Sequence, residues 1–180
     1  MNELPAMPQK NVLITGPPGA GKTTVIQKVA EALGEREGGF YTTELKVGGQ
    51  RTGFNINTLN GKTAPLAVVR GGVGPRVGRY VVNLVGIDQV AVPSILHAIS
   101  DAKVVMIDEI GKMELYSVAF RNAVHRAFSA PGPVVATIME RQNEFCDEIK
   151  RRPDVVLLHV SLENRDEMPG MVLERLRSYL

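Results

Sequence analysis

The chain contains 180 residues, of which 44% are hydrophobic and 22% are charged, a composition typical of a soluble globular protein with a sizeable core. Its net charge of +2 argues against a surface that coats nucleic acid. Cys146 is the single cysteine, which excludes a disulfide within the chain and a multi-cysteine metal site. No apolar stretch approaches the roughly 20 residues of a membrane helix, and residues 1–10 lack the apolar core of a secretory signal. We therefore expect one cytoplasmic domain over residues 1–180 that binds neither membranes nor nucleic acid, while its protein partners stay unknown.

A glycine-rich segment near the N-terminus carries the most informative pattern. Residues 11–15 form a short apolar run that predicts a buried strand. The next residues, 16–23, fit G-x-x-x-x-G-K-[ST], and apolar residues then recur at helical spacing up to Gly34. A strand, this loop and a helix in that order predict a phosphate-binding loop. The nucleotide-binding residues expected in it are Gly16, Pro17, Pro18, Gly19, Ala20, Gly21, Lys22, Thr23 and Thr24.

The residue types of this loop suit the binding of a triphosphate. Its glycines allow backbone N–H groups to close around phosphate oxygens, and the N-terminus of the following helix adds partial positive charge. Lys22 can reach the β- and γ-phosphates and act in catalysis, and the Thr23 hydroxyl can ligate Mg²⁺. The sequence therefore predicts a nucleotide-phosphate site with Mg²⁺ as its cofactor.

Residues 39–85 break the alternation of strands and helices that the rest of the chain predicts. Two strands at 39–47 and 51–59 flank a short glycine-containing turn, which is typical of a hairpin. Further strands are expected before and after a glycine-rich loop, at 63–69 and 76–83. We therefore predict an antiparallel extension inserted after the first strand–helix unit.

The second half of the chain predicts a repeated strand–helix pattern. Residues 104–107 form a continuous apolar run, as expected for a central strand covered on both faces. Helices are expected at 87–100, 114–128, 143–152 and 168–179, and strands at 133–138 and 155–160. The fold class is therefore predicted as α/β, a P-loop NTPase fold with a doubly wound, mostly parallel sheet and an antiparallel hairpin extension.

Two acidic residues, Asp108 and Glu109, follow the apolar run directly. In P-loop proteins an apolar strand that ends in Asp supplies the acid that holds Mg²⁺, and a neighbouring Glu can activate the attacking water. Taken alone, the pattern fits a strand whose end is capped by solvated acids. The phosphate loop upstream favours an active site, with Asp108 associated with the metal and Glu109 as the catalytic base.

Hydrolysis builds negative charge on the transferred phosphoryl group, so a further cation is expected at the site. Lys112 is the favoured candidate because it follows Glu109 by three residues in a loop that should lie beside the phosphates. Glu114 either contributes to the same site or lies in the first turn of its helix, where negative charge is favoured. The competing cations are Arg51, Arg70, Arg76, Arg79, Arg121, Arg126 and Arg141.

Several segments together resemble a known family, the small P-loop nucleoside-triphosphatases first described from thermophiles, which include the human cancer-related nucleoside-triphosphatase. Besides the phosphate loop, the resemblance rests on residues 39–44 with 49–54, Arg76–Asn83, Ile107–Leu115 and Glu163–Arg165. These segments follow the family's order over nearly the whole chain. Two departures are small, because Arg79 stands where the family often has Lys and Tyr116 where it often has Phe.

The resemblance implies Mg²⁺-dependent hydrolysis of nucleoside triphosphates (ATP, GTP, CTP and UTP) to diphosphates, with broad tolerance of the base. It places phosphate binding on Gly16–Thr23. It also implies a second nucleotide-contacting segment, which comprises Val104, Val105, Met106, Ile107, Asp108, Glu109, Ile110 and Gly111.

The sequence gives little information on how the nucleotide base is recognised. Asn164 and Arg165 follow the last predicted strand and are the candidate base-side residues, although they could simply cap and solvate a loop. No Asn-Lys-x-Asp sequence is present to select guanine. Two alternative functions stay open: a nucleoside or nucleotide kinase, for which the basic run 150–152 is a weak lid candidate, and a nucleotide-dependent switch or adaptor.

Overall fold

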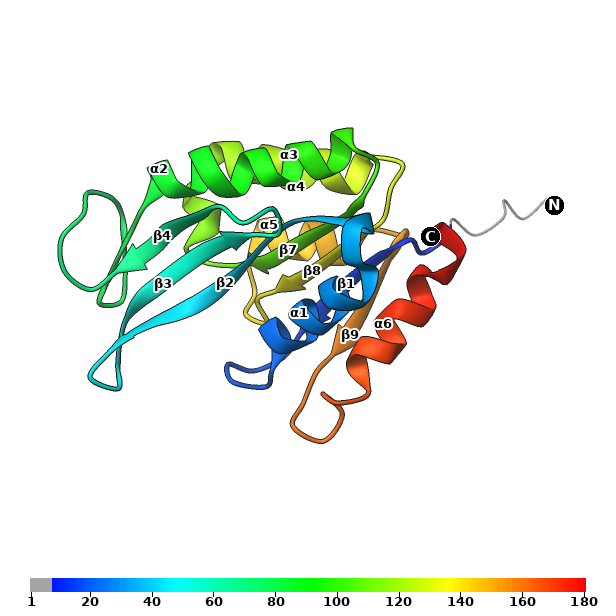
Figure 1. Cartoon of the computed structure of the whole chain (residues 1–180), viewed down its shortest axis with the longest axis horizontal. Coiled ribbons are helices and arrows are strands. Elements are labelled where there is room, and N and C mark those ends of the chain that lie inside the picture. Colours follow the sequence, from blue (N-terminus) through cyan, green and yellow to red (C-terminus); the bar gives the residue numbers. More distant parts are fainter. Residues whose placement is uncertain (1–7) are drawn as a thin grey trace.

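The structure, a computed structural model, describes residues 8–180. The expectation that residues 1–10 carry no secretory signal therefore falls largely outside the described residues. All strands in the described part join one mixed sheet in the order β5-β6-β4-β3-β2-β7-β8-β1-β9, with helices on both faces (Figure 1). Within residues 8–180, no helix combines the length and the apolarity that crossing a bilayer requires.

The parallel half of the sheet forms the centre of the molecule. Strand β1 (Asn11–Thr15) pairs in parallel with β8 (Val134–Ile138) on one side and with β9 (Val155–His159) on the other. Strand β7 (Val104–Ile110) lies beside β8, and every residue of β1 and β8 is buried. The apolar runs of the sequence form these strands because both of their faces are covered by helices.

The antiparallel extension forms as predicted, and β2 (Glu37–Val47) connects it to the parallel half. The first residues of β2 pair in parallel with β7, and the rest pair antiparallel with β3 (Gln50–Thr58), which in turn pairs with β4 (Thr63–Val68). The prediction of a single strand at 76–83 is wrong. This segment is a tight hairpin of β5 (Arg76–Val77) and β6 (Tyr80–Val82), because Gly78 adopts φ +58° and reverses the chain.

Helices cover the two faces of the sheet in two groups (Figure 1). Helices α1 (Lys22–Leu33) and α6 (Met168–Leu176) pack against one face through one buried cluster. Helices α3 (Val92–Ser100), α4 (Val118–Ser129) and α5 (Glu144–Lys150) pack against the other face through a second cluster. This arrangement is the doubly wound α/β class that the sequence predicts.

Two predicted helices differ from the observed ones. The helix expected at 87–100 begins earlier, with α2 (Leu84–Gly86) and a π-helical stretch at 87–91 that leads into α3 at the turn that contains Pro93. The helix expected at 114–128 is divided into a 3₁₀ turn, Glu114–Tyr116, and α4, because the extended backbone of Ser117 separates them. Short 3₁₀ turns also follow α1 at Gly34–Arg36 and α6 at Arg177–Tyr179.

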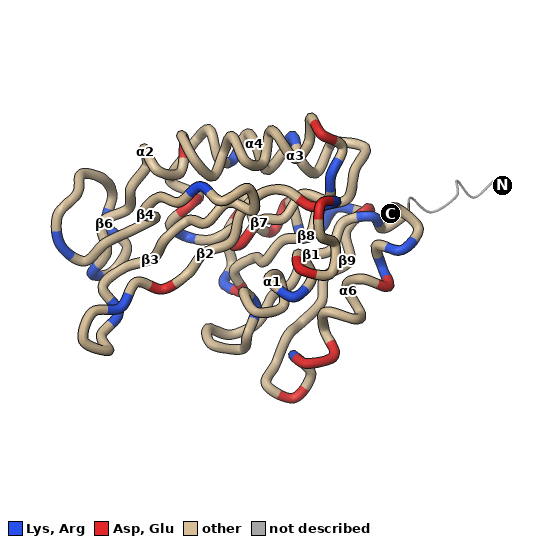
Figure 2. Tube along the Cα trace, in the orientation of Figure 1, with Lys and Arg blue, Asp and Glu red and all other residues tan. Residues whose placement is uncertain are grey.

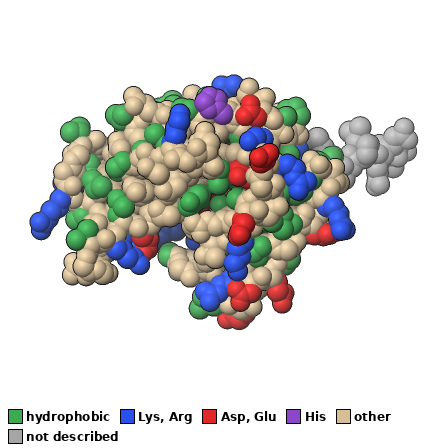
Figure 3. Space-filling model, viewed as in Figure 1, with side chains coloured by type: hydrophobic (Ala, Val, Ile, Leu, Met, Phe, Trp, Pro, Cys, Tyr) green, Lys and Arg blue, Asp and Glu red, His purple; other side chains and the backbone are tan. Residues whose placement is uncertain are grey.

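Charged side chains are distributed over the whole fold. Figure 2 shows lysines and arginines interspersed with acids along the chain, and Figure 3 shows both signs mixed on one face. This agrees with the small net charge of +2 and gives no continuous basic face in these views.

Ser117 provides a test of the division between the 3₁₀ turn and α4. Its Oγ accepts a hydrogen bond from the Phe120 N–H at 2.9 Å and donates one to the Asp88 carboxylate. We expect Ser117→Ala to lower the free energy of unfolding by about 1 kcal/mol, the usual loss for an N-cap. Urea unfolding measures this, with Ser178→Ala at an exposed position as the control. Equal stability of the two variants would contradict a capping role for Ser117.

Candidate nucleotide site

The phosphate loop lies between the end of β1 and the start of α1, and two of its glycines are required by its geometry. A Cβ at Gly16 would lie 2.4 Å from the Val160 carbonyl oxygen, and Gly21 adopts φ +103° as it leads into α1. The Lys22 ammonium donates to the carbonyl oxygens of Gly16 at 2.8 Å and Pro17 at 3.2 Å. The lysine is therefore folded over its own loop, within reach of any phosphate that binds there.

Asp108 is the most tightly held polar side chain near the loop. It lies in β7, and 1% of its surface is exposed. Its Oδ2 accepts from the Thr23 hydroxyl at 2.9 Å and from the Thr42 N–H and hydroxyl at 3.2 and 3.3 Å. Its Oδ1 accepts from the Thr137 hydroxyl at 2.6 Å. These bonds fix the carboxylate beside Thr23 and satisfy a charge that would otherwise be costly to bury.

Thr42 and Thr137 are site residues that the sequence interpretation missed. Thr137 is a fully buried polar residue in the otherwise apolar strand β8, and this is the signal that could have identified it. Thr42 carried a weaker signal, because it lies in one of the segments that resemble the family. Both threonines come from strands that neighbour β7 in the sheet.

Two further acids, Glu109 and Glu114, lie next to Asp108. The Glu109 side chain packs over Gly111, where a Cβ would lie 2.5 Å from its Oε1. Burial raises the pKa of Glu109, the nearby Asp108 carboxylate raises it further, and Lys22 opposes this shift. Burial and the adjacent Glu109 also raise the pKa of Glu114, which is 5% exposed. Glu114 therefore belongs to the carboxylate group of the site as well as to the first turn after β7.

A cavity of about 530 Å³ opens between the phosphate loop and the antiparallel extension. The predicted site residues that line it are Gly19, Gly21, Lys22, Thr23, Thr24, Asp108, Glu109 and Lys112. None of the candidate arginines lines this cavity in the described part of the chain. Three of them bond elsewhere: Arg51 pairs with Glu44, Arg79 donates to the Arg51 carbonyl, and Arg121 to the Leu115 carbonyl. Lys112 is thus the cation best placed to join Lys22.

The rest of the 104–111 segment does not reach this cavity. Val104, Val105, Met106, Ile107 and Ile110 are buried in the hydrophobic clusters on the two faces of the sheet. Gly111 is buried beneath the Glu109 side chain. Only the two acids of this segment face the space beside the phosphate loop, so the apolar residues position the acids and make no part of the cavity wall.

A second cavity, of about 260 Å³, adjoins the loop at Gly21 and Thr24. Arg165 lines it together with Lys28, and a Cβ at Gly21 would lie 3.4 Å from the Arg165 Cδ. Asn164 has a different role, because its side chain accepts from the Ser161 N–H and donates to the His159 carbonyl, both at 2.9 Å. Asn164 thus holds the turn, and Arg165 is the residue that lies against the phosphate loop.

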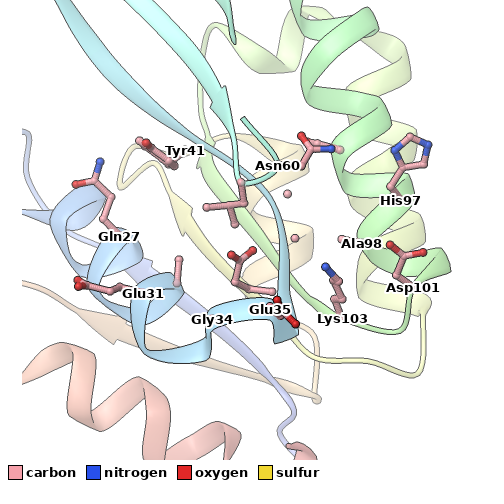
Figure 4. A pocket seen from close by; sticks show the side chains of 16 residues that line it. Gln27, Glu31, Gly34, Glu35, Tyr41, Asn60, His97, Ala98, Asp101 and Lys103 are labelled. Atoms are coloured by element: carbon pink, nitrogen blue, oxygen red, sulfur yellow. The ribbon is translucent and has the colours of Figure 1, made fainter. Parts of the chain in front are cut away.

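A cavity of about 880 Å³ lies elsewhere in the structure. It lies at the far end of α1, where Gln27 and Glu31 face His97 and Asp101 across an opening (Figure 4). Glu37 also lines it, and burial raises the pKa of this carboxyl, whose Oε2 is buried without a hydrogen-bond partner. No residue of the phosphate loop reaches this cavity, so the smaller cavity beside Asp108 is the candidate active site.

The basic run 150–152 has a structural role. Lys150 donates to the Met139 carbonyl at 2.9 Å. Arg152 bonds both carboxylate oxygens of Asp154 at 2.9 Å and the Phe128 carbonyl at 2.8 Å. These contacts of Lys150 and Arg152 attach the end of α5 to its neighbours.

Comparisons with known proteins agree with this arrangement. A family described as NTPase matches residues 11–173. The nucleoside-triphosphatase THEP1 of Thermofilum pendens is 46% identical over 178 residues, which cover 96% of this chain and 98% of that protein. The chain belongs to the NTPase family. The human cancer-related nucleoside-triphosphatase is 41% identical over 177 residues, which cover 88% of this chain and 92% of the human protein.

The NTPase family assignment confirms the resemblance found in the sequence. The crystal structure of THEP1 from the hyperthermophile Aquifex aeolicus superposes with a TM-score of 0.86 at 39% identity, covering 92% of this chain and 98% of that one. The α/β fold with its antiparallel extension is therefore shared with a solved member of the NTPase family.

Proposed function

We propose that the chain hydrolyses nucleoside 5′-triphosphates to diphosphate and phosphate, with Mg²⁺ and with little selection of the base. The observation that carries the proposal is the bond of 2.9 Å between the Thr23 hydroxyl and the buried Asp108 carboxylate, beside Lys22. It joins the two halves of a phosphate-and-metal site that are 85 residues apart in the sequence. The assignment to the NTPase family supports the same reaction.

The oxygen ligands of this site fit Mg²⁺. The ion prefers octahedral oxygen coordination at 2.0–2.1 Å, so two adjacent ligands lie about 3 Å apart. The Thr23 and Asp108 oxygens are separated by this distance, and Mg²⁺ commonly takes one or two protein carboxylates with phosphates and waters completing its shell. Thr23 and Asp108 would therefore hold the ion, which when bound would neutralise charge on the β- and γ-phosphates.

The protein side chains divide the remaining work. Lys22 exchanges the carbonyl oxygens of Gly16 and Pro17 for phosphate oxygens, which are stronger acceptors. Glu109 accepts a proton from the attacking water, and the raised pKa of its carboxyl makes it a better base than an exposed glutamate. Lys112, on the wall of the same cavity, supplies positive charge as the phosphoryl group leaves.

The cavity at Arg165 is the proposed place for the base. It adjoins the cavity of the carboxylates at Gly21 and Thr24, so a triphosphate laid along the loop can direct its nucleoside towards Arg165. A guanidinium plane can stack on any base, whereas selection needs positioned donors and acceptors. We also propose that the protein acts in the cytoplasm, which suits the buried thiol of Cys146.

Lys22→Ala tests the phosphate loop. We expect turnover to fall by about a hundredfold or more, because the variant loses charge stabilisation of the phosphates, and triphosphate binding to weaken. Phosphate release and calorimetric binding of a non-hydrolysable ATP analogue measure the two effects. Lys62→Ala, at an exposed turn, is the matched control. Near-normal turnover in folded Lys22→Ala would remove this lysine from the site.

A pair of variants separates the roles of the two acids. Glu109→Gln should keep nucleotide affinity and lose hydrolysis, whereas Asp108→Asn should raise the Mg²⁺ concentration needed for activity. In the wild-type protein, activity should fall as the pH drops through the raised pKa of Glu109, because the protonated carboxyl cannot accept a proton. Equal losses of nucleotide binding in both variants would contradict this division.

Base tolerance is the third test. ATP, GTP, CTP and UTP should differ in kcat/KM by about tenfold or less, a spread near 1.4 kcal/mol. Steady-state phosphate release with each nucleotide measures this. A preference above a hundredfold for one base would reveal a selective pocket that the Arg165 side of the loop does not explain.

A further inference from the structure

The two cavities beside the phosphate loop suggest room for two molecules. Gly21 and Thr24 line both of them. On the proposed function, from which this inference follows, the nucleoside part of the triphosphate lies on the Arg165 side, in about 260 Å³. Its γ-phosphate then points into the cavity of about 530 Å³ that contains Asp108 and Glu109. The far part of this larger cavity, on the side of the antiparallel extension, is then left for a second molecule.

That far part has an apolar wall. Phe54 of β3, Leu66 of β4, Val77 of β5 and Met113 line it, so most of the wall comes from the antiparallel extension. The Phe54 ring packs against Tyr80 with centroids 5.2 Å apart and against the Arg51 guanidinium at 5.5 Å, and neither of these partners belongs to the cavity wall. A water molecule needs no such surface. Sites for small organic molecules have this character, mostly apolar with a few placed polar groups, in volumes of about 300–1,000 Å³.

The charges on the wall select the kind of molecule. Three carboxylates besides Asp108 line the cavity: Glu44, Glu109 and Glu114. The facing cations are Lys22, which serves the triphosphate, and Lys112. Glu44 is paired with Lys46 and Arg51, and burial raises the pKa of Glu114, so the wall beside the apolar residues carries little net charge and suits an uncharged molecule. An uncharged molecule with a planar ring and hydroxyl groups suits the flat Phe54 surface and the hydrogen-bonding groups of Thr43 and Glu44.

We propose that the apolar part of this cavity is a phosphoacceptor site for a nucleoside. A hydroxyl oxygen of the nucleoside sugar attacks the γ-phosphorus, and a new P–O bond forms. The bond between that phosphorus and the β,γ-bridging oxygen breaks, and the nucleoside diphosphate leaves with the electron pair. The hydroxyl proton passes to the Glu109 carboxylate. Water takes the place of this hydroxyl in the hydrolysis described above, so the two reactions share one set of groups.

The test incubates the full chain with γ-³²P-ATP and Mg²⁺ and measures which product carries the ³²P label. Adenosine, guanosine, cytidine, uridine and thymidine are each added at about 1 mM, the upper end of ordinary KM values. Thin-layer chromatography separates labelled nucleoside monophosphate from labelled inorganic phosphate. We expect at least one nucleoside to give labelled monophosphate and to reduce phosphate release. Phosphate release without labelled monophosphate from any nucleoside would overturn the acceptor site and leave the proposed hydrolysis standing, whereas loss of both products would overturn both.

Variants connect the product to this cavity. Val77→Phe fills the apolar part and should lower the ratio of monophosphate to phosphate at least tenfold. Val73→Phe, at a 97% exposed loop position, is the matched control and should keep the ratio. An unchanged ratio in Val77→Phe would place the nucleoside elsewhere and overturn the proposal. Lys22→Ala, purified in the same way, should form neither product, and labelled monophosphate from that preparation would trace the reaction to a contaminating kinase.

Discussion

The hydrogen-bonded carboxylate of Asp108 is the contact on which the rest of the site depends. Its donors come from Thr23 in α1, Thr42 in β2 and Thr137 in β8. One buried charge therefore joins the phosphate loop, the extension and the parallel sheet. If one of these donors moved away, the buried carboxylate would lose a hydrogen bond without gaining water in its place. The free-energy cost of that loss holds the three elements in a fixed arrangement.

Strand β2 connects the parallel sheet to the antiparallel extension. Its beginning pairs in parallel with β7, the strand that carries Asp108 and Glu109, and its later part is the first strand of the extension. Thr42 lies just beyond the parallel register that ends at Phe40, where it can reach Asp108. The extension therefore forms a wall of the candidate site, because the same strand supplies Thr42, Thr43 and Glu44 to the cavity.

The sequence predicts the parts of the fold that local pattern determines. The phosphate loop, the apolar run before Asp108 and the hairpin predicted at residues 39–59 are such parts, because glycine spacing and apolar periodicity depend on near neighbours in the chain. Ser117 and Gly78 are different. The extended backbone of Ser117 divides the predicted helix, and the positive φ of Gly78 divides the predicted strand. Sequence periodicity cannot detect a single residue that changes the direction of the chain.

The same limit applies to the candidate site. Lys22, Thr23, Asp108 and Glu109 were predicted from motifs, and they converge on one cavity. Thr137 and Thr42 were missed because their role exists only when three strands lie side by side. Asn164 and Arg165, adjacent in the sequence, could not be separated by pattern alone. In the structure Asn164 holds a turn and Arg165 lies against the phosphate loop, since successive side chains leave a turn in different directions.

The short hairpin at the end of the extension has a consequence for solubility. A sheet of this width ends in a strand whose outward N–H and C=O groups can pair with another molecule. Here that edge is β5, a strand of two residues that follows Pro75 and begins with Arg76. A short edge next to a proline and carrying a charge offers a poor template for intermolecular β-pairing. The hairpin that contributes Val77 to the apolar wall of the cavity thus also protects this edge of the sheet from edge-to-edge pairing.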